Sequence, residues 1–204
     1  TRRSSAGWGQ LLHGFGAVLH NRPFVGYILQ LGFAQGILFG NIASSPFIVQ
    51  EHYGFSAFGF SLCFAANSLA IMSAAALAVR FRRQERATLL GCRGMLLFSL
   101  ATAAALACHC GFWLYEVLVF ALLFSMGITF PATTTLAMDC TREHAGTASA
   151  LLGAVCFAFG GLVSPLVGMG DTLLSTGTVF VVCAVGSWLA FRSALHHRNR
   201  LAVA

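Results

Sequence analysis

Six long uncharged runs divide the chain, and short polar or charged segments separate them. Each run is near or above the roughly 20 residues that a helix needs to cross a bilayer. The expected spans are residues 24–49, 55–79, 94–115, 117–138, 146–170 and 173–191. The pattern therefore predicts an all-α membrane protein with six transmembrane helices.

Two basic segments flank this predicted bundle, which covers residues 24–191. Residues 1–23 form a basic arm in which Trp8, Leu11 and Phe15 belong to an apolar series at helical spacing, so we expect a short amphipathic helix on the membrane surface. Residues 192–204 form a basic tail. Because the chain begins with Thr1, we expect it to be cut from something longer.

Composition supports a membrane environment. The chain is 57% hydrophobic and 9% charged, whereas soluble domains carry about 25% charged residues. Its 12 basic residues are all arginine, and with 6 acidic residues they give a net charge of +6. These arginines lie between apolar runs, so we interpret them as orientation signals and predict no nucleic-acid partner.

The segment Arg80–Arg93 sets the predicted orientation, because it carries five arginines between two apolar runs. Arginine-rich loops stay in the cytoplasm. With six spans, both termini then lie in the cytoplasm as well, and every arginine falls on that side. Glu51, Glu116 and Asp171 fall on the outer side, and we expect every acidic residue to lie at a span end or in a loop, with none in the hydrocarbon core.

A short sequence repeat supports two related halves within the bundle. Glu51 begins EHYGFSAFGF and Glu143 begins EHAGTASALL, 92 residues later and on the opposite side of the predicted membrane. Two three-helix units of opposite orientation form an inverted repeat, which is common in transporters. A chance match of four residues is the alternative.

Polar side chains deep in the spans are the candidates for substrate contact or for hydrogen bonds between helices, because such groups usually face protein or a cavity. The candidates, with one aromatic residue that could stack on a substrate, are Gln30, Gln35, Phe39, Asn41, Asn67, Thr129 and Thr133.

Small residues and prolines mark candidate packing and flexing positions. Gly32, Gly36 and Gly40 form a ridge that admits another helix, either for plain packing or for a sliding contact. Prolines within spans permit kinks. The candidate flexing positions are Pro131 in the fourth span and Gly160, Gly161 and Pro165 in the fifth.

Little in the sequence favours metal or enzyme chemistry. Cys108, His109 and Cys110 are consecutive, whereas zinc ligands are more widely spaced, so we expect no metal site and no cofactor. A nucleophile elbow, a phosphate-binding loop and a zinc-protease motif are all absent from the sequence, so we do not expect an enzyme. The acids lie at span ends or in loops, so we expect this segment to lack a proton-coupling carboxylate.

Three stretches carry a resemblance to a known family. They are SPFIVQEHYGFSAFGFSLCFAANSL at 45–69, FPATTTLAMDCTREHAGTASALLG at 130–153, and GGLVSPLVG at 160–168. With them, the chain resembles the C-terminal half of a major facilitator superfamily transporter, of the Bcr/CflA branch of drug:proton antiporters.

The resemblance implies a location and roles for the helices. In that fold the first and fourth helices of each half line the cavity, the second and fifth form the seam between halves, and the third and sixth lie outside. Gln30, Gln35, Asn41, Thr129 and Thr133 would then face substrate, with Asn67 near the seam. The protein would lie in the cell inner membrane with both termini cytoplasmic.

The resemblance also implies the function and the partners. The family has twelve spans, so this chain is expected to be the C-terminal half of a multidrug efflux carrier. Its partners would be an amphipathic small molecule, the lipid bilayer, and the missing N-terminal half or a second copy. The alternatives are a truncated remnant that transports nothing, a six-helix half active only as a homodimer, and a membrane-bound metal or redox protein using Cys108–Cys110.

Overall fold

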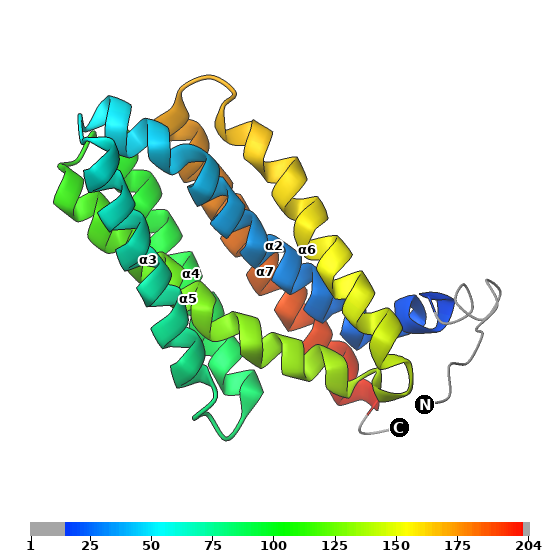
Figure 1. The fold of residues 1–204 in the computed structure, drawn as a ribbon. Helices are drawn as coiled ribbons and strands as arrows, with labels where there is room; N and C mark the ends of the chain where they lie inside the picture. Colours follow the sequence, from blue (N-terminus) through cyan, green and yellow to red (C-terminus); the bar gives the residue numbers. More distant parts are fainter. Residues whose placement is uncertain (1–14, 202–204) are drawn as a thin grey trace, which may run out of the picture.

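The computed structural model of the protein describes residues 15–201 and shows six long helices in that range, each long and apolar enough to cross a membrane (Figure 1). The helices are α2 (Arg22–Pro46), α3 (Ala57–Ala78), α4 (Gln84–Ala107), α5 (Phe112–Asp139), α6 (Ala145–Val167) and α7 (Thr172–Leu201). The π-helical segment η1 (Phe47–His52) continues α2, and the 3₁₀ turn η2 (Arg142–His144) precedes α6. The predicted class and the six spans are confirmed. Residues 15–20 are helical, and the part of the predicted arm helix before them lies outside the described residues.

Local side-chain chemistry sets several helix starts. Asn21 Oδ1 accepts a hydrogen bond from the Phe24 amide at 3.1 Å, and Pro23 occupies the first turn of α2. Ser56 Oγ accepts from the Gly59 amide at 3.2 Å at the start of α3. Asp171 Oδ1 accepts from the amides of residues 173 and 174 at the start of α7. Each cap pairs amide groups that a helix start leaves without a partner.

The helices pack in two groups of three that have equivalent contacts. α2 packs chiefly against α6 and α7, and α5 packs chiefly against α3 and α4 (Figure 1). In chain order, α2 corresponds to α5, α3 to α6 and α4 to α7. The contact of α2 with α7 then corresponds to that of α5 with α4, and the contact of α2 with α6 corresponds to that of α5 with α3. α2 and α5 also touch, and α4 packs against α7, which joins the groups. This arrangement is what a 3+3 repeat with exchanged first helices produces, because α2 packs with the last two helices of the second unit and α5 with the last two of the first.

Glycines allow the close approach of neighbouring helices. A Cβ at Gly127 of α5 would lie 2.7 Å from the Ile71 carbonyl oxygen of α3. One at Gly91 of α4 would lie 2.4 Å from Thr129 Cγ2 of α5. Such separations are impossible for real side chains, so these helices can pack as they do only around glycine.

The boundary between the third and fourth spans differs from the prediction. α4 ends at Ala107 rather than residue 115, and α5 begins at Phe112 rather than residue 117. The turn is instead made by residues 108–111, where His109 has φ 49°. Glu116 therefore lies in the second turn of α5, and its prediction in the turn between the two spans is wrong. Asn67 Nδ2 of α3 donates a hydrogen bond to its carboxylate at 2.9 Å.

Two helices extend into segments that were predicted as loop or tail. α4 begins at Gln84 rather than residue 94, and α7 continues through Arg192 and Arg198. Arginines fit near the ends of membrane helices because their stems pack while their charged heads find partners. The Arg192 guanidinium lies 4.9 Å from the Trp188 ring centre, and Arg198 pairs with Glu85 of α4.

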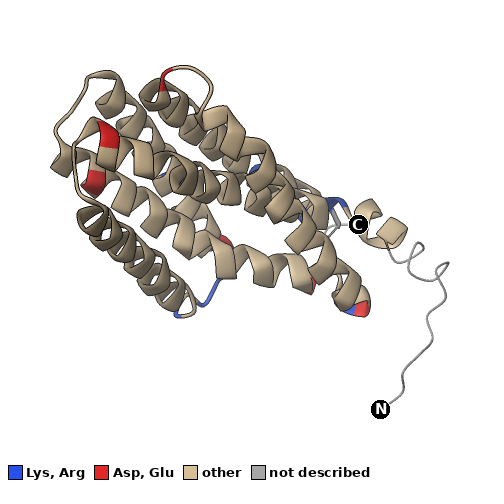
Figure 2. Ribbon diagram, turned by 45° about the horizontal axis from the view of Figure 1, so that its top comes forward, with Lys and Arg blue, Asp and Glu red and all other residues tan. Residues whose placement is uncertain are grey.

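The described arginines gather towards one end of the bundle (Figure 2). This end, called the arginine end below, carries the turns at 79–83 and 140–144 and both ends of the described chain, residues 15 and 201 (Figure 1). The turns at 53–56, 108–111 and 168–171 lie at the opposite end and contain no arginine.

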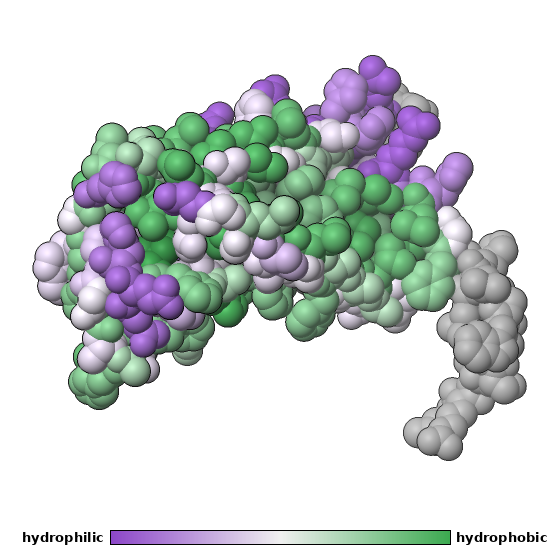
Figure 3. All heavy atoms as spheres, turned by 90° about the horizontal axis from the view of Figure 1, so that it is seen from above, coloured by the Kyte–Doolittle hydropathy of each residue, from purple (hydrophilic) through white to green (hydrophobic). Residues whose placement is uncertain are grey.

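On the face seen in Figure 3, apolar side chains cover most of the surface between the two ends. Burial is uneven: 67% of the most apolar stretch of α2 is buried, against 17% for α3 and 22% for α6. Phe58 and Met72 of α3 and Phe157 of α6 are 74%, 65% and 71% exposed. α3 and α6 therefore present apolar faces that the described chain does not cover.

Candidate functional site

Three of the predicted substrate contacts point into the bundle. Gln30 is fully buried, and its Nε2 donates to Ser187 Oγ of α7 at 3.0 Å. Thr129 and Thr133 are also fully buried; Thr129 Oγ1 donates to the Met126 carbonyl at 2.8 Å, and Thr133 Oγ1 shares a hydrogen bond with Thr88 Oγ1 of α4 at 3.1 Å. These groups are engaged in hydrogen bonds on the sides of α2 and α5 that face α4 and α7.

The predicted residues Asn41 and Asn67 come together in a small polar pocket. It lies where α2, α3 and α5 meet, towards the end opposite the arginines, and has a volume of about 10 Å³. We call it the Glu116 pocket. Its lining comprises Asn41, Ser45 and Val49 from the α2–η1 segment, Phe60, Cys63, Phe64 and Asn67 from α3, and Tyr115 and Glu116 from α5.

Glu116 is the functional candidate that the sequence reasoning missed. It was assigned to a turn because it carries a charge. The sequence contains no helical period around it, because residues 112–115 and 117–123 are all apolar. Only burial in the structure separates Phe112, Tyr115 and Val119 from their neighbours and shows that the helix continues through position 116.

Gln35 and Phe39 remain partly exposed on α2. The Phe39 ring packs where Gly160 of α6 has no side chain, since a Cβ there would lie 2.5 Å from it. Its ring centre is 6.0 Å from that of Phe157, which is largely exposed. An aromatic and amide surface thus runs from α2 to the uncovered face of α6.

The predicted glycine ridge of α2 lies against both α6 and α7. A Cβ at Gly32 would meet the Phe159 ring of α6 at 2.7 Å. One at Gly36 would lie 2.9 Å from Cys183 Sγ of α7, and one at Gly40 would lie 3.3 Å from Val179. The ridge packs α6 and α7 side by side on α2.

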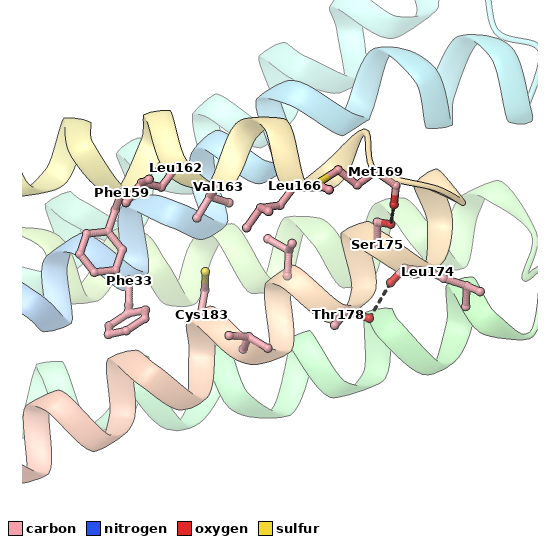
Figure 4. A pocket seen from close by; sticks show the side chains of 12 residues that line it. Phe33, Phe159, Leu162, Val163, Leu166, Met169, Leu174, Ser175, Thr178 and Cys183 are labelled. Carbon is pink, nitrogen blue, oxygen red and sulfur yellow. Dashed lines mark hydrogen bonds between the residues drawn. The ribbon is translucent and has the colours of Figure 1, made fainter.

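An apolar groove of about 560 Å³ separates α6 from α7 (Figure 4). Phe33 and Phe159, with ring centres 4.7 Å apart, close one end of it. The hydroxyls of Ser175 and Thr178 donate to the backbone carbonyls of Met169 and Leu174, at 2.7 and 2.8 Å (Figure 4). The groove therefore offers apolar surface and few free polar groups. Its volume falls in the range of small-molecule sites.

Of the predicted flexing positions of α5 and α6, Gly160 is buried beneath the Phe39 ring, and the other three are exposed or partly exposed. Pro165 and Gly161 of α6 are exposed, and no atom lies within 4 Å of a Cβ built at Gly161. Pro131 of α5 is partly exposed.

The turn at residues 108–111 packs beside Tyr53. The Tyr53 hydroxyl donates to the Cys110 carbonyl at 2.9 Å and lies 3.7 Å from Cys110 Sγ. Burial, followed by the contact with that thiol, raises the pKa of Tyr53 above its usual range. Cys108 is exposed. Within residues 15–201, no three His, Cys, Asp or Glu side chains are grouped to hold a metal ion, so the structure gives the metal-protein alternative no support.

The amino-acid sequence matches the family model of the Major Facilitator Superfamily over residues 1–165. The chain belongs to the major facilitator superfamily. It is 35% identical over 180 residues to an uncharacterized MFS-type transporter, YdgK, of Bacillus subtilis (strain 168). The alignment covers 86% of this chain and 45% of that relative, so this chain spans about half the length of the relative. Its six helices correspond to one half of the facilitator fold.

Within this facilitator half, burial separates the predicted site residues. Gln30, Thr129 and Thr133 are enclosed by α4 and α7, the third and sixth spans, whereas Gln35 and Phe39 stay accessible. Asn41 and Asn67 instead line the Glu116 pocket. Substrate contact by Gln35 and Phe39 stays a prediction. The enclosed residues do not belong to the aromatic and amide surface that runs from α2 to α6.

Proposed function

We propose that the protein is one half of a secondary transporter that exports amphipathic small molecules, in exchange for protons in the intact carrier. Membership of the facilitator superfamily supports transport and not catalysis. The observation that carries the proposal is uneven burial: α2 and α5 are enclosed, while α3 and α6 leave apolar faces uncovered. A second six-helix unit could pack there, with the transported molecule between the two units.

The chemistry of the accessible surface supports the substrate class. Gln35 supplies an amide, and Phe39 and Phe157 supply stacked aromatic surface. A surface of this kind binds apolar rings and tolerates variation in the rest of the molecule. We therefore place the protein in the Bcr/CflA-type drug-resistance branch. We also propose that it lies in the cell inner membrane with both termini in the cytoplasm.

A dye-efflux assay tests this proposal. Cells that express the naturally encoded protein are loaded with an amphipathic fluorescent dye, and efflux is measured with and without a proton uncoupler. We expect expression to speed efflux and the uncoupler to abolish the increase. Equal dye retention in cells with and without the protein would refute export.

Two variants locate the surface within the same assay. Phe39→Ala removes the ring that connects α2 to α6, so we expect a several-fold slower efflux at equal protein abundance. Leu97→Ala removes a side chain that is 63% exposed on α4, away from that surface, and serves as the matched control. We expect efflux by this variant to equal that of the wild type.

The occupant of the uncovered faces is either the missing N-terminal half or a second copy of this chain. Chemical cross-linking in membranes separates these partners, because a second copy doubles the mass of the cross-linked species. Absence of any partner, together with absence of efflux, would identify a remnant that inserts without transporting.

A further inference from the structure

Glu116 is a half-buried carboxylate without a cationic partner. Within residues 15–201 the ion pairs are Arg142–Asp139 and Arg198–Glu85, and both lie at the arginine end. The hydrogen bond found for the Glu116 side chain comes from Asn67 Nδ2, at 2.9 Å. A carboxylate inside a membrane segment is costly unless a positive charge or several donors compensate it. One neutral amide does not balance its charge.

Four buried oxygen atoms of residues that line the pocket beside Glu116 lack a hydrogen-bond partner. They are Asn41 Oδ1, Ser45 Oγ, Asn67 Oδ1 and the Tyr115 hydroxyl. Their residues are 2%, 6%, 7% and 1% exposed. Buried polar atoms are nearly always paired in folded proteins, and an ion or a water is a common reason for apparent exceptions. The two amide oxygens can only accept a hydrogen bond or bind a cation, and their residues line the same pocket as a carboxylate.

The size of the pocket limits what could supply the missing charge. Its volume of about 10 Å³ corresponds to about one water-sized sphere. A drug-sized compound is excluded, because such ligands need several hundred Å³. One carboxylate is neutralised by one positive charge, which favours a monovalent ion over a divalent one.

We propose that the Glu116 pocket is a binding site for one monovalent cation. Glu116 is its charged ligand, and the oxygens of Asn41, Ser45 and Asn67 are neutral ligands. The cation is either Na⁺ among these oxygens or a proton on Glu116 that is donated to one of them. If the cation is a proton, it is the coupling ion of the proposed carrier, and only this role rests on the proposed transport function. The site joins the enclosed helices α2 and α5 to the uncovered helix α3, so occupation can affect the packing of α3.

Few other titratable groups face Glu116. Cys63 comes from α3 and Tyr115 from α5, and Tyr53 and Cys110 lie beyond Tyr115. α2 contributes Asn41, Ser45 and no titratable side chain to the pocket. Glu116 is therefore the acid of this pocket.

Thermal unfolding of the purified full-length protein in detergent measures binding without transport. In one series, NaCl replaces choline chloride at constant ionic strength and pH; in the other, the pH is lowered in choline chloride. Glu116→Gln removes the charge and keeps the shape. Glu51→Gln makes the same change at an exposed acid near the same end and serves as the matched control.

We expect Tm of the wild type and of Glu51→Gln to rise saturably with the bound cation. The rise should be roughly 5–10 °C at 100 times the dissociation constant. The Glu116→Gln variant should show no such rise. A Glu116-dependent response to NaCl identifies Na⁺; a Glu116-dependent response to pH alone identifies the proton.

Responses of Glu116→Gln that equal those of the wild type in both series would overturn the proposal and leave a water-filled pocket. If Glu116→Gln does not fold, Asn41→Leu removes a neutral ligand and leaves the charge in place. We expect this variant to weaken the cation response at least threefold, and an unchanged midpoint would overturn the proposal. Because unfolding does not depend on export, loss of dye efflux and loss of cation binding can be told apart.

Discussion

At the scale of single residues, a deeply placed polar side chain has two very different roles in this bundle. Gln30 donates to Ser187 of α7 and joins two helices. Asn67 donates to the Glu116 carboxylate and lines the small pocket beside it. Both are amides in the middle of apolar helices, and only their neighbours distinguish a structural contact from a binding site.

The Gln30–Ser187 contact gives a residue-scale prediction. We expect Gln30→Leu and Ser187→Ala each to lower stability in detergent, and the double variant to lose less than the sum of the two. Hydrogen bonds between membrane helices couple by about 0.6 kcal/mol on average, so a coupling of that order is expected. Thermal or denaturant unfolding of the four proteins measures it, and strict additivity would show that the bond contributes nothing.

At the scale of helices, glycines determine which surfaces can meet. α5 contacts α3 through Gly127 and contacts α4 opposite Gly91, which lets the central helix lie between the two. On α2, Gly36 and Gly40 allow α6 and α7 to approach closely in the same way. The equivalent contacts of α2 and α5 therefore depend on small residues at matching interfaces.

Replacement of Gly127 by alanine tests this dependence. The added Cβ would lie 2.7 Å from a backbone oxygen of α3 and 2.8 Å from Ala74 Cβ, so the helices must separate. Overpacking of this kind costs about 1–3 kcal/mol, and we expect a lower Tm in detergent. Gly153→Ala on α6 is the control, because nothing lies within 4 Å of its Cβ and alanine favours a helix. A Gly127→Ala protein as stable as the control would contradict the packing described.

At the scale of the whole molecule, arginine placement defines two different ends. The arginines of the described residues lie in turns or in the helix halves nearer one end, and the turn with Cys108 lies at the other. If the arginine end is cytoplasmic, as we propose, Cys108 faces the exterior. Cys140 lies at the arginine end, and burial raises the pKa of its thiol, so little reactive thiolate forms there at neutral pH.

Labelling of intact cells with a membrane-impermeant maleimide tests the orientation. We expect exposed Cys108 to react from outside and Cys108→Ser to abolish that signal. In the Cys108→Ser background, Arg82→Cys should react only after the membrane is permeabilised. Reaction of residue 82 in intact cells would invert the proposed orientation.

The sequence pattern predicted much at each scale. Hydropathy alone identified six spans, because no soluble arrangement satisfies so many uncharged runs of this length. The glycine ridge at 32, 36 and 40 predicted close helix contact on that face of α2, but not that α6 and α7 would share it. The repeat at Glu51 and Glu143 identified equivalent places, since both copies precede the middle helix of a three-helix unit. Their local structures differ, because Gly54 has φ 72° and ends a π-helical segment, whereas Gly146 is already inside α6.

The class of the protein, the number of its spans and the gathering of its arginines were determined by the sequence, because they follow from the cost of placing charge and unpaired backbone in lipid. Which polar residues meet was decided only by the tertiary structure. Asn41, Asn67 and Glu116 come from three helices, and their contact depends on how those helices rotate and slide against one another. Hydropathy contains no information on that rotation, and this is why a carboxylate assigned to a turn lies instead beside two asparagines within the bundle.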